Sequence, residues 1–286
     1  LITVALFLGM MANTSFAQSD CGGGLGADVV VSDIPNGRGY GSLNGNAAFS
    51  IATIAANIGT EQLWWHDDSN EKPVISQHVY VLKDGRLRQI GIGWLKHGFG
   101  ALQQAYCECT PSGSFYELGV GCADTYTSGL NGNQSLLGPR FEVDAHSGYH
   151  DWPATDYNQT GDVTYKRLRV SESEIVEGLN DETKYFATSL YISLDDATNQ
   201  NGDNNESYRR MYFDTSSNGD WDIDISSSHD PQVGQAAVRI WQDHDPEVVE
   251  TDVRVNHEGL VIAAGKATDL GNGVWHYEYA VENLNS

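Results

Sequence analysis

The chain has 286 residues with 16 Lys and Arg against 39 Asp and Glu, so its formal net charge is −23 at pH 7. Nucleic acids and anionic lipid surfaces are bound through basic surfaces, and this charge therefore excludes nucleic acid as a partner. The composition combines 31 Gly and 14 Tyr with many Asn, Asp, Ser and Thr. Strand formers separated by turn formers predict an all-β protein.

Residues 1–17 form an apolar stretch that ends in Ser15, Phe16 and Ala17, with small residues at the two positions that a signal peptidase reads. The stretch is too short to span a membrane and is followed by polar residues, so it predicts a secretory signal peptide. Because no Met or basic segment precedes it, the peptide is expected to be incomplete at its N-terminus. We expect a secreted protein, extracellular or on the cell surface, with no transmembrane segment in the mature part.

Two β-hairpins are predicted from the turn residues. Residues 76–94 form two extended runs around Asp84 and Gly85, a pair suited to the positive φ angles of a tight turn. Residues 259–283 repeat the pattern around the turn 271–273. In the second of these hairpins, alternate residues share one face: Trp275, Tyr277, Tyr279 and Val281.

Further strands are predicted at residues 184–194, 236–242 and 251–255, and short helices after Ser171 and within residues 97–106. Half-buried antiparallel strands must pack on a second sheet, so the expected fold is all-β: a sandwich or jelly-roll-like arrangement with one or two short helices. Residues 18–286 are expected to form one large domain or two packed sandwiches. The last strand ends without a closing partner, which indicates that the natural protein continues beyond Ser286.

The chain has four cysteines: Cys21, Cys107, Cys109 and Cys122. An exported protein meets an oxidising compartment, so we expect disulfides. Cys107 and Cys109 are too close along an extended strand to bond to each other, so one pairs with Cys122 and the other with Cys21. The alternative is a zinc or copper site formed by thiolates and His97, but the C-x-C spacing lacks the two spaced pairs of a structural zinc site.

Two acidic loops predict calcium binding, because calcium prefers six to eight oxygen ligands and these loops place oxygens at short intervals around glycine. The first loop offers Asp214, Ser216, Asn218, Asp220 and Asp222. The second offers Asp196, Asn199, Asn201 and Asp203. The alternative is that both are solvated turns, because Asn, Asp and Gly favour turns.

Two histidines, His146 and His150, are separated by three residues and flanked by aspartates, which suits copper or zinc if the loop curls around one cation. No G-x-S-x-G, H-E-x-x-H, phosphate-binding loop or dinucleotide fingerprint is present. If the chain has a catalytic site near the cysteines, its residues would include His97, Asp124, Tyr126 and Arg140.

The segment LWWHDD offers a glycan-binding candidate in Trp64, Trp65, His66 and Asp67. Exposed tryptophans stack on sugar rings, and nearby carboxylates accept hydrogen bonds from sugar hydroxyls. The alternative is that one or both tryptophans belong to the core.

Three segments of the chain resemble an uncharacterised family of large exported β-rich bacterial proteins, many of which carry a C-terminal surface-sorting tail. The segments are "GRLRQIGIGWLKHGF", "LGVGCADTYTSGLNGNQSLLGPR" and "KATDLGNGVWHYEYAVENLNS". The resemblance implies export and a β-rich architecture, and it supplies no catalytic residues.

The leading hypothesis is therefore a secreted or cell-surface module, stabilised by calcium, that binds an extracellular polysaccharide or a surface protein. The alternative is a secreted copper or zinc enzyme, or a glycan-directed hydrolase, with its site near His97, His146 and His150.

Overall fold

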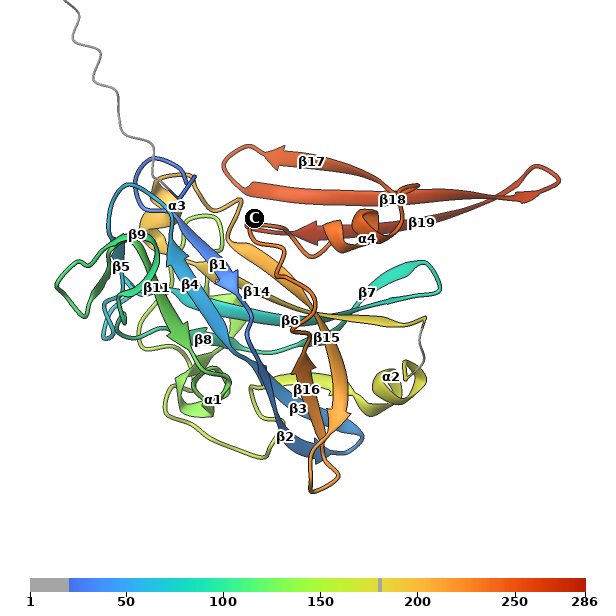
Figure 1. Ribbon diagram of the computed structural model, residues 1–286, viewed down its shortest axis with the longest axis horizontal. Helices are drawn as coiled ribbons and strands as arrows, with labels where there is room; N and C mark the ends of the chain where they lie inside the picture. Colours follow the sequence, from blue (N-terminus) through green and yellow to red (C-terminus); the bar gives the residue numbers. More distant parts are fainter. Residues whose placement is uncertain (1–20, 180–181) are drawn as a thin grey trace, which may run out of the picture.

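The computed structural model describes residues 21–179 and 182–286, and the predicted signal peptide lies outside this part. The described chain consists mostly of antiparallel sheets with a few short helices, which confirms the all-β fold class (Figure 1). Among the described residues, no helix is long and apolar enough to cross a membrane.

The largest sheet in the described part, called the main sheet here, has the strand order β16-β15-β14-β6-β7-β13-β3-β2, with β8 and β12 beside β6. Its strands are β2 (Gly37–Leu43), β3 (Asn46–Ile51), β6 (Val74–Lys83), β7 (Arg86–Ile92), β8 (Leu95–His97), β12 (Leu137–Gly138), β13 (Leu168–Ser171), β14 (Lys184–Ile192), β15 (Glu206–Thr215) and β16 (Trp221–Ile225).

The main sheet curls until its two end strands meet. β2 and β16 lie against each other, and Gly39 N donates a hydrogen bond to Asp222 Oδ1 (2.6 Å). A Cβ atom on Gly39 would lie 2.0 Å from the carbonyl oxygen of Trp221, so only glycine allows this approach.

A first core lies between one face of the main sheet and a smaller sheet with the order β1-β4-β11-β9. The smaller sheet consists of β1 (Val29–Asp33), β4 (Thr53–Asn57), β9 (Gln104–Thr110) and β11 (Val120–Tyr126). Alternate residues of both sheets point into this core, among them Val31, Ala55, Phe49, Val79 and Met211.

A second core covers the opposite face of the main sheet. There β17 (Val249–Val255), β18 (Gly259–Gly271) and β19 (Val274–Asn283) form an antiparallel sheet, called the outer sheet here, and α4 (Arg239–His244) lies beside it (Figure 1). Leu260 and Ile262 of β18, Trp241 of α4 and Phe186 of β14 belong to this core. The β18–β19 hairpin projects beyond the rest of the molecule (Figure 1).

Short elements connect these layers. They are β5 (Leu63–Trp64), which pairs with β10 (Glu117–Leu118), the helices α1 (Ser128–Asn131), α2 (Glu172–Glu177) and α3 (Leu194–Thr198), and the 3₁₀ turns η1 (Gln134–Leu136) and η2 (Arg140–Glu142).

Both predicted hairpins are present. β6 and β7 are joined by Asp84 and Gly85, with φ angles of 52° and 74°, and β18 and β19 are joined through the turn 271–273, where all three φ angles are positive. β14 and β17 confirm the strands predicted at residues 184–194 and 251–255, and α2 confirms the helix after Ser171.

Two local predictions are wrong. Residues 236–242 do not form a strand, because the segment turns into α4 and buries Ile240 and Trp241 consecutively; a short continuous apolar run has no periodicity that distinguishes strand from helix. Residues 97–106 do not form a helix, because β8 ends at His97, Gln103 adopts a φ of 56°, and β9 begins at Gln104.

The cysteines form the bonds Cys21–Cys107 and Cys109–Cys122, which is one of the two pairings that the sequence left open. No cysteine of the described chain is free, so the alternative of a thiolate metal site with His97 is wrong. β9 and β11 are neighbouring strands of the smaller sheet, and the Cys109–Cys122 bond joins them across the connecting loop.

Candidate functional site

Three of the predicted catalytic residues, His97, Asp124 and Tyr126, lie in one buried cluster with Lys96. The Lys96 ammonium lies 4.9 Å from the centre of the Tyr126 ring, and burial lowers the pKa of Lys96. Burial also raises the pKa of Asp124 to about 7. Each of these four side chains is at most 2 % exposed, so the cluster is part of the interior and is closed to a substrate in solution.

The two predicted transition-metal ligands lie in different surroundings. His150 is buried, with its ring 5.0 Å from that of His97, whereas His146 is exposed and lines a separate cavity. Within residues 21–179 and 182–286, no group of three or more His, Cys, Asp or Glu side chains is arranged to hold a metal ion. His146 and His150 therefore lie in different surroundings, and a shared transition-metal site stays a prediction.

The second predicted calcium loop uses its side chains to hold the N-terminal segment. Asp196 Oδ1 accepts a hydrogen bond from Val29 N (2.8 Å), and Asn201 Nδ2 donates to the carbonyl oxygen of Ala27 (2.7 Å). Asn199 Nδ2 donates to Asp195 O, and Asp203 accepts from Arg254 and Asn285. These contacts explain the Asn and Asp content of the loop without a cation, and calcium binding stays a prediction.

The first predicted calcium loop is the β15–β16 turn. Asp214 and Asp222 are cross-strand partners, and Ser216, Asn218 and Asp220 belong to the turn between them. Asp222 Oδ1 accepts hydrogen bonds from the backbone of β2 and β16.

The two tryptophans of the predicted glycan site point in opposite directions. Trp65 is fully buried, and its Nε1 donates to the Tyr126 hydroxyl (3.3 Å). Trp64 is 38 % exposed, and the ring of His66 lies 5.7 Å from that of Tyr116. Asp67 contributes its carbonyl oxygen to Lys72. Trp64, His66 and Asp67 are therefore the members of this segment that a ligand can contact.

Arg140 lies apart from the buried cluster, in the wall of a cavity of about 590 Å³ between β7, η2 and the segment before β13. This cavity, called the Arg140 cavity here, combines positive charge with aromatic surface. Its lining includes the cations Arg140, Lys166, Arg167 and Arg169 and the aromatic residues Trp94, Phe141 and Tyr165.

The segment before β13 has a fixed conformation. Asp162 Oδ1 accepts hydrogen bonds from the backbone nitrogens of Thr164 (2.8 Å) and Tyr165 (3.0 Å), as in an Asx turn. Lys166 follows with a φ of 62°, and its ammonium donates to three backbone carbonyl oxygens, including that of Gln134 (3.2 Å). The aromatic and cationic side chains of this segment therefore start from a rigid backbone.

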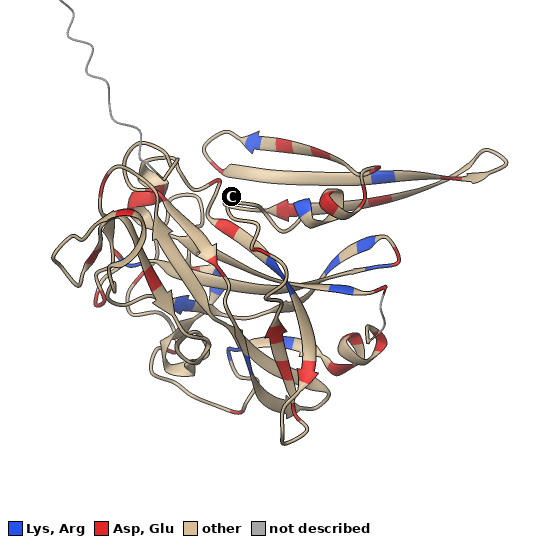
Figure 2. Ribbon diagram, viewed as in Figure 1, with Lys and Arg blue, Asp and Glu red and all other residues tan. Residues whose placement is uncertain are grey.

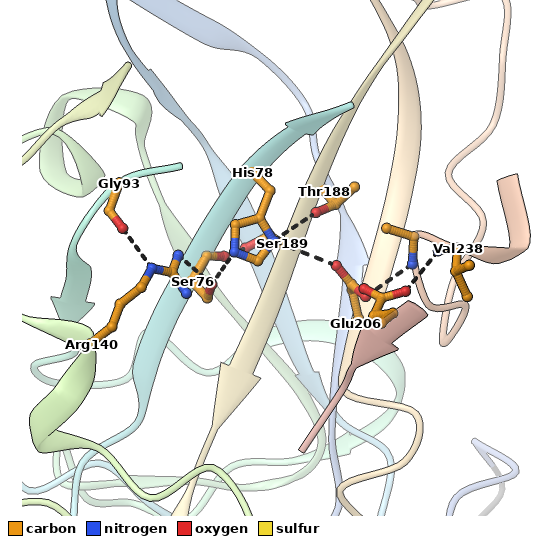
Figure 3. A network of polar contacts seen from close by, with 10 residues as sticks. Ser76, His78, Gly93, Arg140, Thr188, Ser189, Glu206 and Val238 are labelled. Atoms are coloured by element: carbon orange, nitrogen blue, oxygen red, sulfur yellow. Dashed lines mark hydrogen bonds and ion pairs between the residues drawn. The ribbon is translucent and has the colours of Figure 1, made fainter. Parts of the chain in front are cut away.

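Arg140 is held from behind by a polar network (Figure 3). Its Nε donates to Gly93 O (2.7 Å) and its Nη2 donates to Ser76 Oγ (2.8 Å). Because a guanidinium only donates, the Ser76 hydroxyl is left to donate to His78 Nε2, 3.0 Å away. Burial lowers the pKa of His78 to about 3, so its ring is neutral and accepts this hydrogen bond. Burial lowers the pKa of Arg140 to about 10, so Arg140 is charged at neutral pH.

Ser76, His78 and Glu206 follow one another in this network in the order of a hydrolase triad, with His78 Nδ1 3.9 Å from Glu206 Oε1 (Figure 3). However, Ser76 is only 1 % exposed, and its hydroxyl accepts a hydrogen bond from Arg140. The network therefore positions Arg140, and its serine is closed to substrates.

The charge of the Arg140 cavity is opposite to that of the whole protein. Four of the chain's 16 Lys and Arg line it, and within the described residues none of the four forms an ion pair with a carboxylate. Asp162 is the acidic residue of the lining. Figure 2 shows acidic positions spread across the sheets.

Sequence reasoning found Arg140 but missed the other lining residues of this cavity. One signal was present: Lys166, Arg167 and Arg169 fall within four consecutive positions of a chain that has few cations. Trp94 and Phe141 are distant from them in sequence, and only the fold brings them together. Comparisons with protein-family models, curated proteins and solved structures gave no match to this chain.

Proposed function

We propose that this chain is an extracellular binding module for an acidic glycan, a polysaccharide whose sugars carry carboxylate or sulfate groups, and that the Arg140 cavity holds one such sugar. The observation that carries the proposal is the grouping of four cations and three aromatic rings around one cavity in a protein of net charge −23. The two disulfides are compatible with an extracellular location.

Two kinds of contact support this ligand class. Arg140 and Arg169 present guanidinium groups, which form charge-assisted hydrogen bonds with carboxylate or sulfate oxygens. Phe141 is 83 % exposed, and Trp94 and Tyr165 lie with ring centres 6.0 Å apart, so aromatic faces are available to the apolar side of a sugar ring. At physiological salt, dissolved ions screen charges that are more than about 8 Å apart. An acidic sugar in the Arg140 cavity therefore interacts mainly with the cations that line the cavity, and the repulsion from the distant acidic residues is weak.

Arg169→Ala is expected to weaken binding of an acidic oligosaccharide about tenfold, because one charge-assisted hydrogen bond to the ligand is lost. Arg169 is exposed on β13 and has no ion pair within the described residues, so the substitution leaves the fold intact. Calorimetric titration with uronate, sulfated and neutral oligosaccharides of equal length measures the effect and distinguishes carboxylate from sulfate.

The matched control is Arg86→Ala, which removes the same charge from an exposed arginine of the β6–β7 hairpin. It is expected to bind like the parent protein. The proposal fails if neither acidic oligosaccharide binds, if the neutral one binds equally well, or if Arg169→Ala and Arg86→Ala bind alike.

A further inference from the structure

The outer sheet has two different faces, and most of its charged residues lie on the face that packs on the main sheet. Leu260, Ile262 and Ala264 of β18 are buried toward the main sheet, and the residues opposite them on β17 are charged, for example Asp252 opposite Ile262. Directly opposite residues of antiparallel strands point to the same side, so the other face of this sheet is defined by the alternate set. This second face, called the open face here, is formed by Val249, Thr251, Val253, Val255, Val261, Ala263, Gly265, Ala267, Asp269, Trp275, Tyr277, Tyr279, Val281 and Asn283.

The open face is apolar and accessible. Among its residues only Asp269, near the hairpin tip, carries a charge. Tyr279 is 75 % exposed, and Trp275 and Tyr277 are each more than half exposed. A contiguous exposed apolar patch on a protein surface marks an interaction site.

The aromatic residues of the open face lie beside a shallow groove whose base is formed by small residues. Ala263, Gly265 and Ala267 form the base of a groove of about 450 Å³, flanked by Val249 and Thr251 on one side and by Tyr277 and Tyr279 on the other. Its lining also includes Glu247 and Lys266, whose charges form an ion pair with each other (3.0 Å). A Cβ atom on Gly265 would lie 3.1 Å from Cδ1 of Tyr279 and 3.4 Å from its Cε1. The Tyr279 ring therefore lies against the glycine, with its other side toward solvent.

We propose that the open face binds a neutral polysaccharide with flat, apolar ring faces, of the β-1,4-linked hexose type, through Tyr279, Tyr277 and Trp275. These three residues alternate along β19, so successive aromatic side chains are about 7 Å apart on one straight line. Sugar rings of such a polymer present C–H faces that stack on aromatic rings.

The shape and the local charge of the open face favour this occupant over a second copy of the chain. A neutral polymer needs no charged partner, and Asp269 is the one charged residue of this face. Shallow alanine and glycine positions also suit a flat ribbon better than the interlocking side chains of a protein interface. The inference is independent of the acidic-glycan site, because none of these residues lines the Arg140 cavity.

The test is depletion of the whole protein from solution by microcrystalline cellulose and by chitin. The parent protein is expected to partition onto at least one of them, and the double variant Tyr277→Ala/Tyr279→Ala is expected to lose at least tenfold in partition coefficient. Gly265→Val keeps both tyrosines but displaces the Tyr279 ring, and it is expected to weaken retention severalfold.

Tyr212→Ala serves as the matched control, because Tyr212 is a partly exposed tyrosine of β15 away from the open face. It should be retained like the parent, and so should Arg169→Ala, which separates this site from the acidic-glycan site. Circular dichroism verifies that each variant is folded. The inference is overturned if neither polymer retains the parent protein, if the double variant is retained equally, or if light scattering shows a dimer that the double variant abolishes.

Discussion

Replacing Cys21 and Cys107 together by Ser is expected to lower the free energy of unfolding by about 4.6 kcal/mol, whereas the same change at Cys109 and Cys122 is expected to cost about 3 kcal/mol. The first bond joins residues 86 positions apart and the second joins residues 13 positions apart. A longer closed loop removes more conformations from the unfolded chain, so the bond that closes it contributes more stability.

The native contacts around Cys21 also favour a larger loss of stability for the Cys21/Cys107 variant than for the Cys109/Cys122 variant. The first described segment is held by side chains of the distant 195–206 region, such as Asn201 and Asn204, so the disulfide fixes a piece of chain that is already in place. Guanidinium denaturation of both double variants, without reductant, gives the two free energies. Equal losses, or a larger loss for the short loop, would contradict this account.

Replacing Asp196 by Asn is expected to change how stability depends on pH. Asp196 on α3 is fully buried, and burial raises the pKa of its carboxyl to about 8. Its Oδ2 accepts a hydrogen bond from Asn205 Nδ2 (2.7 Å), while Asn205 Oδ1 has no hydrogen-bond partner. Rotation of the Asn205 amide would therefore satisfy the new amide group of the variant, which has the shape of the neutral carboxyl.

The direction of the effect follows from proton linkage. The folded pKa of Asp196, about 8, lies above the unfolded value of 3.8, so the folded state holds more protons between these limits. The stability contributed by the neutral carboxyl is present below about pH 4 and is lost as pH rises toward 8, at no more than about 1.4 kcal/mol per pH unit. His78 and His97 have lowered pKa values and contribute the opposite slope at acidic pH, but they are shared by parent and variant.

The difference in unfolding free energy between Asp196→Asn and the parent is therefore expected to shift by about 4 kcal/mol in favour of the variant between roughly pH 5 and pH 8. Urea denaturation at several pH values measures it. Asp230→Asn, which removes an exposed carboxylate, controls for net charge. A constant difference across this range would show that Asp196 does not take up a proton on folding.

Local sequence patterns predicted the elements whose signals are contained within a few residues. The turns at Asp84 and Gly85 and at 271–273 require positive φ angles, and the Asp, Asn and Gly residues there are the types that adopt such angles. The presence of disulfides was predicted from the expected export of the chain to an oxidising compartment and from the spacing of its four cysteines. The strand predicted at 236–242 was wrong because α4 is shorter than two turns, which leaves too little sequence to show a helical period.

The sites depended on contacts that no local pattern records. The alternation of Trp275, Tyr277 and Tyr279 was visible in the sequence, but whether that face is covered depends on which side of β18 packs on the main sheet. The Arg140 cavity likewise joins η2 to residues of β7 and of the segment before β13. The buried lysine Lys96 was missed because a cation inside a strand gives no sequence signal of its burial.

The contact between β2 and β16 has a consequence for how the chain acquires its structure. Gly39 meets Asp222 only after almost two hundred intervening residues have been arranged into paired strands. Non-local contacts of this kind must overcome a large loop-closure entropy before they contribute stability, and proteins rich in them fold slowly. Closure of the main sheet is therefore expected to be a late event in folding, and until it occurs the outer edges of β2 and β16 are accessible to other chains, which favours aggregation.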